Sequence, residues 1–212
     1  EYQVKDAGIE IMFVMTNYYN LMKEVQPKTK IKKLIVTNLK ESLPPILNIL
    51  FTVAKEKKGG FRVQVASDDV MMQDLIHKYS PSQRPKVELG PDDVALFQYS
   101  GGTTGISKGA IALHRNLVAN ALQIRSWMTN ADDGKEVVLM AIPLFHVYGM
   151  VAGMLFGIYT GATLVMVPNP RDLPDVLNSL EKFKASIFPG VPTLYNAINN
   201  HKDVVAGKYK LN

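Results

Sequence analysis

The sequence predicts an α/β fold with a mostly parallel sheet built from βαβ units. Short β-branched strand patterns alternate along the chain with helical patterns, and this alternation is typical of βαβ units. The 212 residues are 47% hydrophobic, which is enough for a sizeable core and excludes wholesale disorder. No internal repeat stands out, so a repeat architecture is not expected.

The first part of the chain already shows this alternation. The expected elements are a helix tail over residues 1–9, strands over 9–14 and 32–37, a weak helix over 18–25, an apolar stretch over 44–53 and a helix over 68–79. Residues 81–91 form a proline-rich connection of low apolar content, which interrupts regular structure. This connection is the best internal boundary and divides the chain into approximate sub-lobes, 1–90 and 91–212.

The alternation of strand and helix patterns is more regular in the second part of the chain. The expected elements are a strand over residues 93–99, a glycine-rich loop over 100–109, a helix over 111–127, a strand over 136–141, a glycine-spaced helix, a strand over 162–167, a helix over 172–184, a strand over 185–188 and a helix over 191–200. Pro192 suits the first turn of the last helix. The helix over 172–184 is amphipathic. Its apolar face is formed by Leu173, Val176, Leu177, Leu180 and Phe183.

The composition excludes several kinds of site. The chain has no cysteine, which excludes disulfides, thiolate nucleophiles and Cys-built zinc or iron–sulfur sites. Absence of cysteine fits a reducing compartment, and no signal-peptide pattern is visible, so a cytoplasmic protein is expected. The formal net charge of +5 favours anions without selecting among nucleotides, CoA, lipid head groups and nucleic acid.

Residues 147–167 raise the question of a membrane span, because these 21 residues carry no charge and are long enough to cross a bilayer. Glycines recur at every fourth position, as in small-residue helix-packing faces: Gly149, Gly153, Gly157 and Gly161. Residues 159–162 look like a helix end, and residues 162–167 look like a short β-branched strand that Pro168 ends. We therefore predict a buried helix and a buried strand, with glycines that let the helix approach another backbone closely.

The segment Ser-Gly-Gly-Thr-Thr-Gly-Ile-Ser-Lys-Gly, residues 100–109, is the most informative part of the chain. Its glycines leave backbone N–H groups unshielded, its hydroxyls add donors, and Lys108 adds a positive charge. A polyphosphate needs this set of groups, although an ordinary surface loop is the simpler alternative. The loop is not a Walker A motif, because Ser107 precedes Lys108 and Gly109 follows it, and no Gly-x-Gly-x-x-Gly occurs.

The same ten residues resemble the phosphate-binding signature of the adenylate-forming superfamily, which comprises acyl-CoA synthetases, luciferases and peptide-synthetase adenylation domains. Residues 141–149 resemble the family's Pro-Leu-x-His motif, and residues 187–195 resemble its next strand–helix junction beside the acyl pocket. Gln98 and Tyr99 before the loop, with residues 169–172, are similar to bacterial and archaeal long-chain fatty-acid–CoA ligases. One residue departs from the pattern, because the family most often has Pro where Ser107 stands.

The resemblance implies a two-step reaction. A fatty-acid carboxylate attacks the α-phosphate of ATP to give acyl-adenylate and pyrophosphate, and CoA then displaces AMP to give acyl-CoA. ATP and CoA are the implied co-substrates and Mg²⁺ is the implied metal. Because charge builds on phosphate oxygens, positioning and electrostatics are expected to carry most of the catalysis. Nucleic acid is not an expected partner, and the oligomeric state stays open.

The resemblance also assigns site residues. The implied ligands of the β- and γ-phosphates are Ser100, Gly101, Gly102, Thr103, Thr104, Gly105 and Lys108. Lys108, Thr104 and His146 are the implied catalytic residues, with the Thr104 hydroxyl preferred near Mg²⁺. His146 matches the family residue between the acyl carboxylate and the phosphate, whereas on its own it would suggest a core histidine. Pocket-lining candidates, with core packing as the alternative, are Gly149, Gly153, Gly190, Val191 and Thr193.

Some groups that the resemblance implies do not occur in this sequence: an aromatic-Gly-x-Thr-Glu stretch with a metal-binding Glu, a ribose-binding Asp, a hinge Arg and the Lys of a C-terminal domain. The chain also starts with Glu1. We therefore expect residues 1–212 to be a fragment of an AMP-binding N-terminal domain, without the C-terminal domain and inactive alone. Two alternatives remain: an enzyme that delivers its acyl group to a carrier protein, and a non-catalytic nucleotide- or lipid-binding module.

Residues 44–60 carry a separate hypothesis. An apolar stretch there is followed by Lys55, Lys57 and Lys58, and such a segment can lie on an anionic membrane surface. The preferred interpretation is a buried helix with a solvated basic end. A fatty-acid substrate that partitions into lipid is what raises the peripheral membrane alternative.

Overall fold

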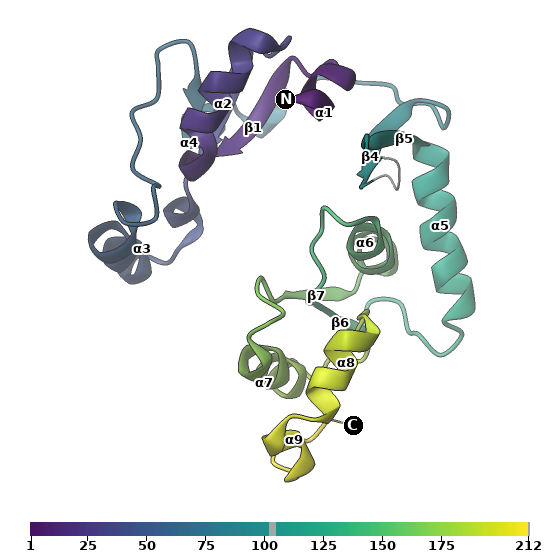
Figure 1. The fold of residues 1–212 in the computed structure, drawn as a ribbon. Coiled ribbons are helices and arrows are strands. Elements are labelled where there is room, and N and C mark those ends of the chain that lie inside the picture. The colour runs from purple at the N-terminus through teal and green to yellow at the C-terminus, as the bar shows by residue number, and fades with distance from the viewer. Residues whose placement is uncertain (102–104, 212) are drawn as a thin grey trace. The chain divides into compact units, whose positions relative to one another are not determined.

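The computed structural model describes residues 1–101 and 105–211 (Figure 1). The chain divides into two units, and each is described by itself. Unit 1 contains Glu1–Glu88 and Tyr99–Ala110, and unit 2 contains Leu89–Gln98 and Ile111–Asn212. Both units contain parallel strand pairs, which confirms the predicted α/β class.

Unit 1 is built on a three-stranded sheet of order β1-β2-β3. Strand β1 (Ile11–Met15) pairs in parallel with β2 (Lys33–Thr37), and β2 pairs in parallel with the short β3 (Val70–Met71). The helices of this unit are α1 (Tyr2–Asp6), α2 (Tyr19–Val25), α3 (Pro45–Phe51) and α4 (Met72–Lys78). Leu34 and Val36 of β2 are fully buried, so the second predicted strand forms the centre of this core.

The helix predicted over residues 68–79 begins later than expected. The Asp69 carboxylate accepts hydrogen bonds from the Leu34 N–H at 2.9 Å and from the Tyr19 hydroxyl at 2.7 Å. These bonds tie the segment to the sheet, so Val70–Met71 becomes strand β3 and α4 starts at Met72. Asp69, one of the two acidic residues that suggested a helix start, is therefore an anchor of a strand.

Unit 2 contains a parallel pair formed by β6 (Val137–Met140) and β7 (Thr163–Met166). The strand predicted over residues 185–188 is reduced to one parallel bridge between Ile187 and Val138. The helices of this unit are α5 (His114–Trp127), a π-helical segment (Gly149–Leu155) that continues as α6 (Phe156–Thr160), α7 (Leu173–Phe183), α8 (Pro192–Asn199) and α9 (Lys202–Val205).

Strands β4 (Val94–Ser100) and β5 (Lys108–Leu113) form a two-stranded sheet on either side of the glycine-rich loop. The predicted helix over residues 111–127 was wrong at its start, because residues up to Leu113 belong to β5. Helix α5 begins at His114, where the Leu113 N–H donates to the Asn116 side chain at 2.9 Å. Lys108 and Gly109, expected in the loop, lie in β5.

Helix α7 buries most of its predicted face. Val176 and Leu177 are fully buried against Leu139 of β6, with Leu173 and Leu180 packed beside them. Phe183 is an exception, because it remains exposed and its ring lies 5.1 Å from the Lys182 ammonium.

The glycine-spaced helix is a packing element. Added methyl groups would collide with the strands: a Cβ on Gly153 would lie 2.2 Å from the Met140 side chain, and one on Gly157 would lie 2.3 Å from the Leu164 side chain. The helix ends at Gly161, whose φ of +67° favours glycine. The glycines thus allow close packing, but against the Met140 and Leu164 side chains and not against another backbone as predicted. In the part of the chain that the structure describes, no helix is long and apolar enough to cross a membrane.

We predict that Gly153→Leu destabilises the full-length protein by about 1–3 kcal/mol, because a buried Met140 leaves no room for the new side chain. Urea unfolding measures the change. Ile158→Ala is the matched control, since Ile158 lies on the same helical segment with its side chain exposed and should cost less than about 0.5 kcal/mol. Equal stability of the Gly153→Leu variant and the wild type would contradict this packing role.

Candidate functional site

A pocket of about 540 Å³ lies in unit 2 at the carboxyl ends of its parallel strands. Its wall comes from residues 141–148 after β6, residues 170–173 after β7, and residues 191–197 after the bridge at Ile187. Open α/β sheets place their ligands at this edge, and the volume suits a small molecule. The wall is mainly apolar, and its polar side chains are His146, Tyr148, Arg171 and Thr193.

A turn at the end of β6 holds His146 in this wall. The His146 N–H donates to the Pro143 carbonyl at 3.0 Å, and the His146 carbonyl accepts from the Met150 N–H at 2.9 Å. The imidazole Nδ1 accepts from the Tyr148 N–H at 3.2 Å. Because Nδ1 acts as an acceptor, we assign the proton of the neutral ring to Nε2. The Nε2–H group is therefore the one that can donate to a ligand.

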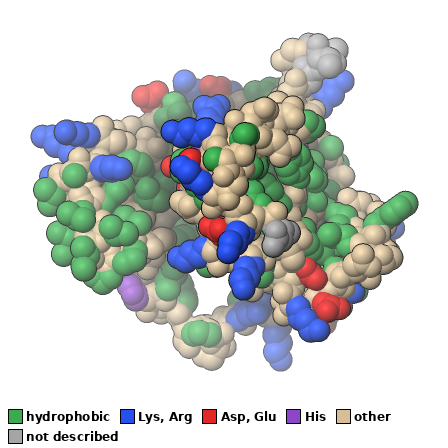
Figure 2. All heavy atoms as spheres, turned by 90° about the horizontal axis from the view of Figure 1, so that it is seen from below, with side chains coloured by type: hydrophobic (Ala, Val, Ile, Leu, Met, Phe, Trp, Pro, Cys, Tyr) green, Lys and Arg blue, Asp and Glu red, His purple; other side chains and the backbone are tan. Residues whose placement is uncertain are grey.

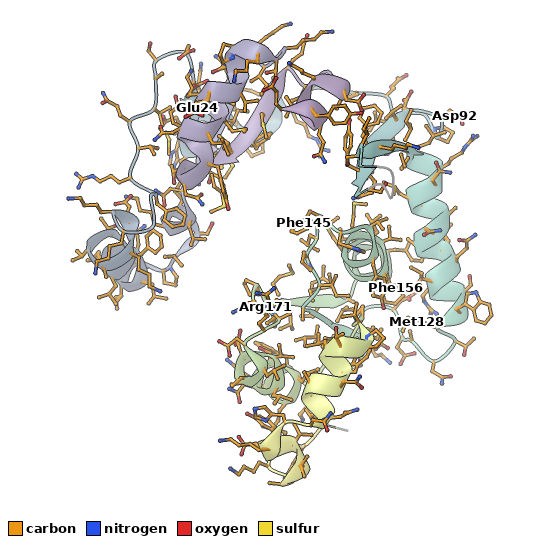
Figure 3. The ribbon with its side chains drawn as sticks, viewed as in Figure 1. Glu24, Asp92, Met128, Phe145, Phe156 and Arg171 are labelled. Atoms are coloured by element: carbon orange, nitrogen blue, oxygen red, sulfur yellow. The ribbon has the colours of Figure 1, made fainter. Side chains whose placement is uncertain are left out.

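Arg171 lines the same pocket and brings a positive charge to it. Its position in the segment before α7 is labelled in Figure 3. Its neighbours build the turn: the Asn169 side chain accepts from the Arg171 N–H at 3.2 Å, and the Asp172 carboxylate accepts from the Asp175 N–H at 3.3 Å to cap α7. Among the described residues, no ion pair involves the Arg171 guanidinium. Sequence reasoning noted residues 169–172 without giving Arg171 a role; the signal was an Asn-Pro-Arg-Asp turn after a buried strand.

The other predicted substrate residues divide into two kinds. Val191 and Thr193, at the start of α8, lie in the pocket wall. Gly149 and Gly190 lie behind it: a Cβ on Gly149 would be 2.5 Å from the Pro143 carbonyl oxygen, and one on Gly190 would be 2.6 Å from the Tyr195 ring. These two glycines therefore give the wall its shape, while Gly153 packs against β6.

A second pocket in unit 2, of about 710 Å³, shares Tyr148 with the first. It is lined by Ile124 of α5, by Met128 just after that helix, by Val151 of the π-helical segment and by residues 186–189. Gln98 of β4 reaches the turn before His146, where its side chain donates to the Phe145 carbonyl at 3.4 Å.

The glycine-rich loop belongs to unit 1. Three of its predicted phosphate ligands lie outside the described residues: Gly102, Thr103 and Thr104. Ser100 ends β4 and Lys108 begins β5, and both side chains are exposed, as are Gly101 and Gly105. Gly105 has a φ of +86°, a conformation that side chains disfavour. The described part of the loop thus presents backbone, a hydroxyl and a cation to solvent.

Ser107 closes the base of this loop. Its hydroxyl donates to the Ser100 carbonyl at 2.7 Å and accepts from the Gln3 side chain at 3.3 Å. Proline, which the resemblance would favour at this position, has no side-chain donor. The departure from the family pattern therefore supplies a hydrogen bond across the loop.

Tyr99 fixes the end of β4 within unit 1. Its hydroxyl donates to the Asp6 carboxylate at 2.6 Å, and this bond raises the pKa of Tyr99 to about 12. Its ring covers Gly109, where a Cβ would lie 2.9 Å from the ring carbon Cζ. Sequence reasoning missed Asp6, because the contact joins residues 93 positions apart.

The metal prediction depends on Thr104, which lies outside the described residues. Within residues 1–101 and 105–211 no group of three or more His, Asp or Glu side chains could hold a metal ion. The described residues thus form no protein-only cation site, and no step below is derived through the metal.

Comparisons with known proteins agree with these features. The long-chain-fatty-acid–CoA ligase of Escherichia coli O157:H7 is 32% identical over 205 residues, and that of Bacillus subtilis (strain 168) is 31% identical over 212 residues. Each match covers 96% of this chain and 36% of the relative. The crystal structure of a long-chain-fatty-acid–CoA ligase (FadD1) from Archaeoglobus fulgidus matches with a TM-score of 0.67 at 21% identity, covering 94% of this chain and 33% of that one.

The structural likeness confirms the predicted fold, and the curated relatives confirm the predicted resemblance to long-chain fatty-acid–CoA ligases. The chain spans about one third of the length of these relatives. The family described as AMP-binding enzyme matches residues 1–211. This protein therefore belongs to the AMP-binding enzyme family.

Proposed function

We propose that the full-length protein activates a long-chain fatty acid with ATP and transfers the acyl group to CoA. A fatty-acid carboxylate oxygen forms a bond to the α-phosphorus of ATP, and the bond from that phosphorus to the bridging oxygen breaks, which releases pyrophosphate. The CoA thiol then attacks the acyl carbon and AMP leaves. The observation that carries this proposal is an apolar pocket with a histidine and an arginine at the carboxyl ends of the parallel strands.

His146 and Arg171 are the proposed polar groups of the acyl site. The Nε2–H of His146 donates to the carboxylate or to an α-phosphate oxygen, on which negative charge builds as the bond forms. The Arg171 guanidinium adds a positive charge to a pocket that is otherwise mainly apolar, where electrostatic interactions are stronger than in water. Val191 and Thr193 complete the wall, while Gly149 and Gly190 hold its shape.

The glycine-rich loop is the proposed polyphosphate site. Backbone N–H groups, the Ser100 hydroxyl and the Lys108 ammonium bind the β- and γ-phosphates, together with Gly101, Gly102, Thr103, Thr104 and Gly105. The Ser107 hydrogen bond supports this role because it holds the two strand ends at a fixed separation. Thr104 near Mg²⁺ remains a prediction.

The acyl chain has two candidate locations in unit 2. Both pockets are mainly apolar and both are lined by Tyr148, so an acyl chain can enter either from the carboxylate site.

We further infer that the protein is cytoplasmic. We also infer that residues 1–212 alone do not catalyse the reaction, because the metal-binding Glu, ribose-binding Asp and C-terminal Lys motifs do not occur in this sequence.

We predict that the full-length protein, supplied with ATP, palmitate and CoA, forms palmitoyl-CoA and AMP in equal amounts, whereas residues 1–212 form neither. Mass spectrometry and chromatography measure both products. Acyl-adenylate without palmitoyl-CoA would support a carrier-protein acceptor instead. Formation of ADP, or AMP release that does not depend on the fatty acid, would contradict the proposal.

A further inference from the structure

Helix α3 presents its apolar face to solvent. Ile46 is 74% exposed, Ile49 65% and Leu50 57%, and Val53, in the π-helical turn that continues α3 (Thr52–Glu56), is 82% exposed. Their spacing of three, four and seven residues places them on one side of a helix. The preferred prediction for this stretch, a buried helix with a solvated basic end, was therefore wrong.

Polar contacts hold α3 in this orientation. The Asn48 side chain donates to the Lys40 carbonyl at 2.8 Å. On the following turn, Glu56 is buried, forms an ion pair with Lys40 at 2.6 Å and accepts from the Asn38 side chain at 3.2 Å. The buried Phe51 packs edge-to-face on Phe61, with ring centroids 5.2 Å apart. Polar groups and one aromatic ring attach the segment to the protein, while its other apolar side chains face solvent. An ordinary surface helix has the opposite arrangement, with its apolar side facing the protein.

Lysines follow the exposed face. Lys55, Lys57 and Lys58 are exposed, and in the described part of the chain none of them forms an ion pair. A groove of about 760 Å³ lies beside α3, and Leu47, Leu50, Lys55 and Lys58 are among the residues that line it. Figure 2 shows hydrophobic side chains gathered at the left of the view, over α3, with basic side chains beside them.

We propose that α3 and the lysines after it dock the full-length protein on an anionic phospholipid surface. Helices that lie in the membrane interface combine an exposed apolar face with basic residues, and each lysine near an anionic surface adds to the attraction. The Glu56 charge is balanced by its ion pair with Lys40, and the half-buried Glu41, which accepts from the Thr37 hydroxyl, is outnumbered by the three exposed lysines. The charge facing outward is therefore positive and complements an anionic membrane.

The choice of a lipid surface as the binding partner of α3 rests partly on the proposed function. A long-chain fatty acid partitions into lipid, and an enzyme bound to the membrane surface would meet its substrate there. The physical claim of docking is separate from the chemistry. Binding to vesicles needs no ATP or fatty acid, so a failure of docking and a failure of catalysis are observed in different assays.

The test is co-sedimentation of the full-length protein with vesicles of phosphatidylcholine containing about one third phosphatidylglycerol. We expect binding that weakens about tenfold or more on neutral vesicles and in about 0.5 M salt, because salt screens the lysines. Lys55→Glu, Lys57→Glu and Lys58→Glu together should weaken binding about tenfold or more. Ile46→Gln with Val53→Gln should weaken it by a similar factor, because apolar burial is lost.

Matched controls lie in the same unit. Lys30→Glu, Lys78→Glu and Lys86→Glu together change three exposed lysines elsewhere, and Ile76→Gln with Val87→Gln changes two exposed apolar residues. Both control proteins should bind as the wild type does. Because all these side chains are exposed, thermal unfolding should show no loss of folding in any variant.

Two results would overturn the proposal. The first is wild-type protein that does not sediment with anionic vesicles. The second is binding that the α3 variants leave unchanged. A shift from dimer to monomer in the Ile46→Gln and Val53→Gln protein, without vesicle binding by the wild type, would assign the face to a second copy. A fall in its unfolding temperature, again without vesicle binding, would assign the face to another part of the same protein.

Discussion

Replacing His146 by alanine is expected to lower the rate of adenylate formation by the full-length protein roughly 100-fold to 1000-fold. The substitution removes the Nε2–H donor from the pocket wall, where we propose that charge builds on the phosphate and carboxylate oxygens. It also removes the Nδ1 acceptor of the Tyr148 N–H. Fatty-acid-dependent exchange of pyrophosphate into ATP measures the effect on the first step alone.

Two further variants separate these two effects. Asparagine at position 146 keeps an acceptor near the place of Nδ1 but has no donor at the place of Nε2, so His146→Asn should fold normally and remain slow. Glutamine carries an amide donor near the place of Nε2, so His146→Gln should recover part of the rate. His77→Ala is the control, because His77 is exposed on α4 and should have no effect. Wild-type exchange by His146→Ala would remove His146 from the mechanism.

Replacing Asp69 by alanine is expected to destabilise the protein by about 3–5 kcal/mol, the largest stability effect that we predict. The Asp69 side chain is fully buried and pairs with the Lys23 ammonium at 3.0 Å. It also accepts from the Leu34 N–H and the Tyr19 hydroxyl. Removal of the carboxylate leaves these donors without a partner and releases β3 from the sheet. Urea unfolding measures the loss.

The neighbouring Asp68 gives the control. It contacts the same Lys23 at 3.3 Å, but its side chain is 62% exposed, so Asp68→Ala should cost less than about 1 kcal/mol. Similar losses for the two variants would show that the buried network is not what stabilises unit 1.

The effect of Asp69 also depends on pH. Burial opposes ionisation of this carboxyl, but hydrogen bonds from Leu34, Tyr19 and Lys23 outweigh burial and lower its pKa below the ordinary value. A lowered folded-state pKa stabilises the protein above the unfolded-state pKa of about 3.9. This contribution is lost as the pH falls through the unfolded and then the folded pKa. The difference in stability between wild type and Asp69→Ala should therefore shrink below about pH 4.

Local patterns in the sequence were sufficient to predict many of the helices and strands of the fold. The β-branched run in β2 and the apolar face of α7 are periodic signals, and both elements formed where they were expected. Gly153 and Gly157 indicated close packing of the helix, which occurs against the Met140 and Leu164 side chains and not against another backbone. Predicted element boundaries were wrong where a contact with a residue distant in sequence determines them. Asp69 accepts a hydrogen bond from Leu34 of β2, and the segment predicted to start a helix therefore forms strand β3.

The site was predictable as a set of motifs but not as a set of contacts. His146 and the glycine-rich loop have distinctive neighbours in sequence. Ser107 and Tyr99 act through Gln3 and Asp6, which lie about a hundred residues earlier and leave no local pattern. The exposure of the apolar face of α3 could not be predicted from the sequence either. The orientation of α3 depends on the buried Glu56 and on the ion pair between Glu56 and Lys40.

The most direct test of the proposed chemistry is ATP–pyrophosphate exchange by the full-length protein without CoA, with and without palmitate. We predict exchange that requires palmitate, and that is lost when Lys108 of the loop or His146 of the pocket is replaced by alanine. Exchange that is absent with every long-chain fatty acid, or that proceeds equally without one, would contradict the claim that this site forms an acyl-adenylate.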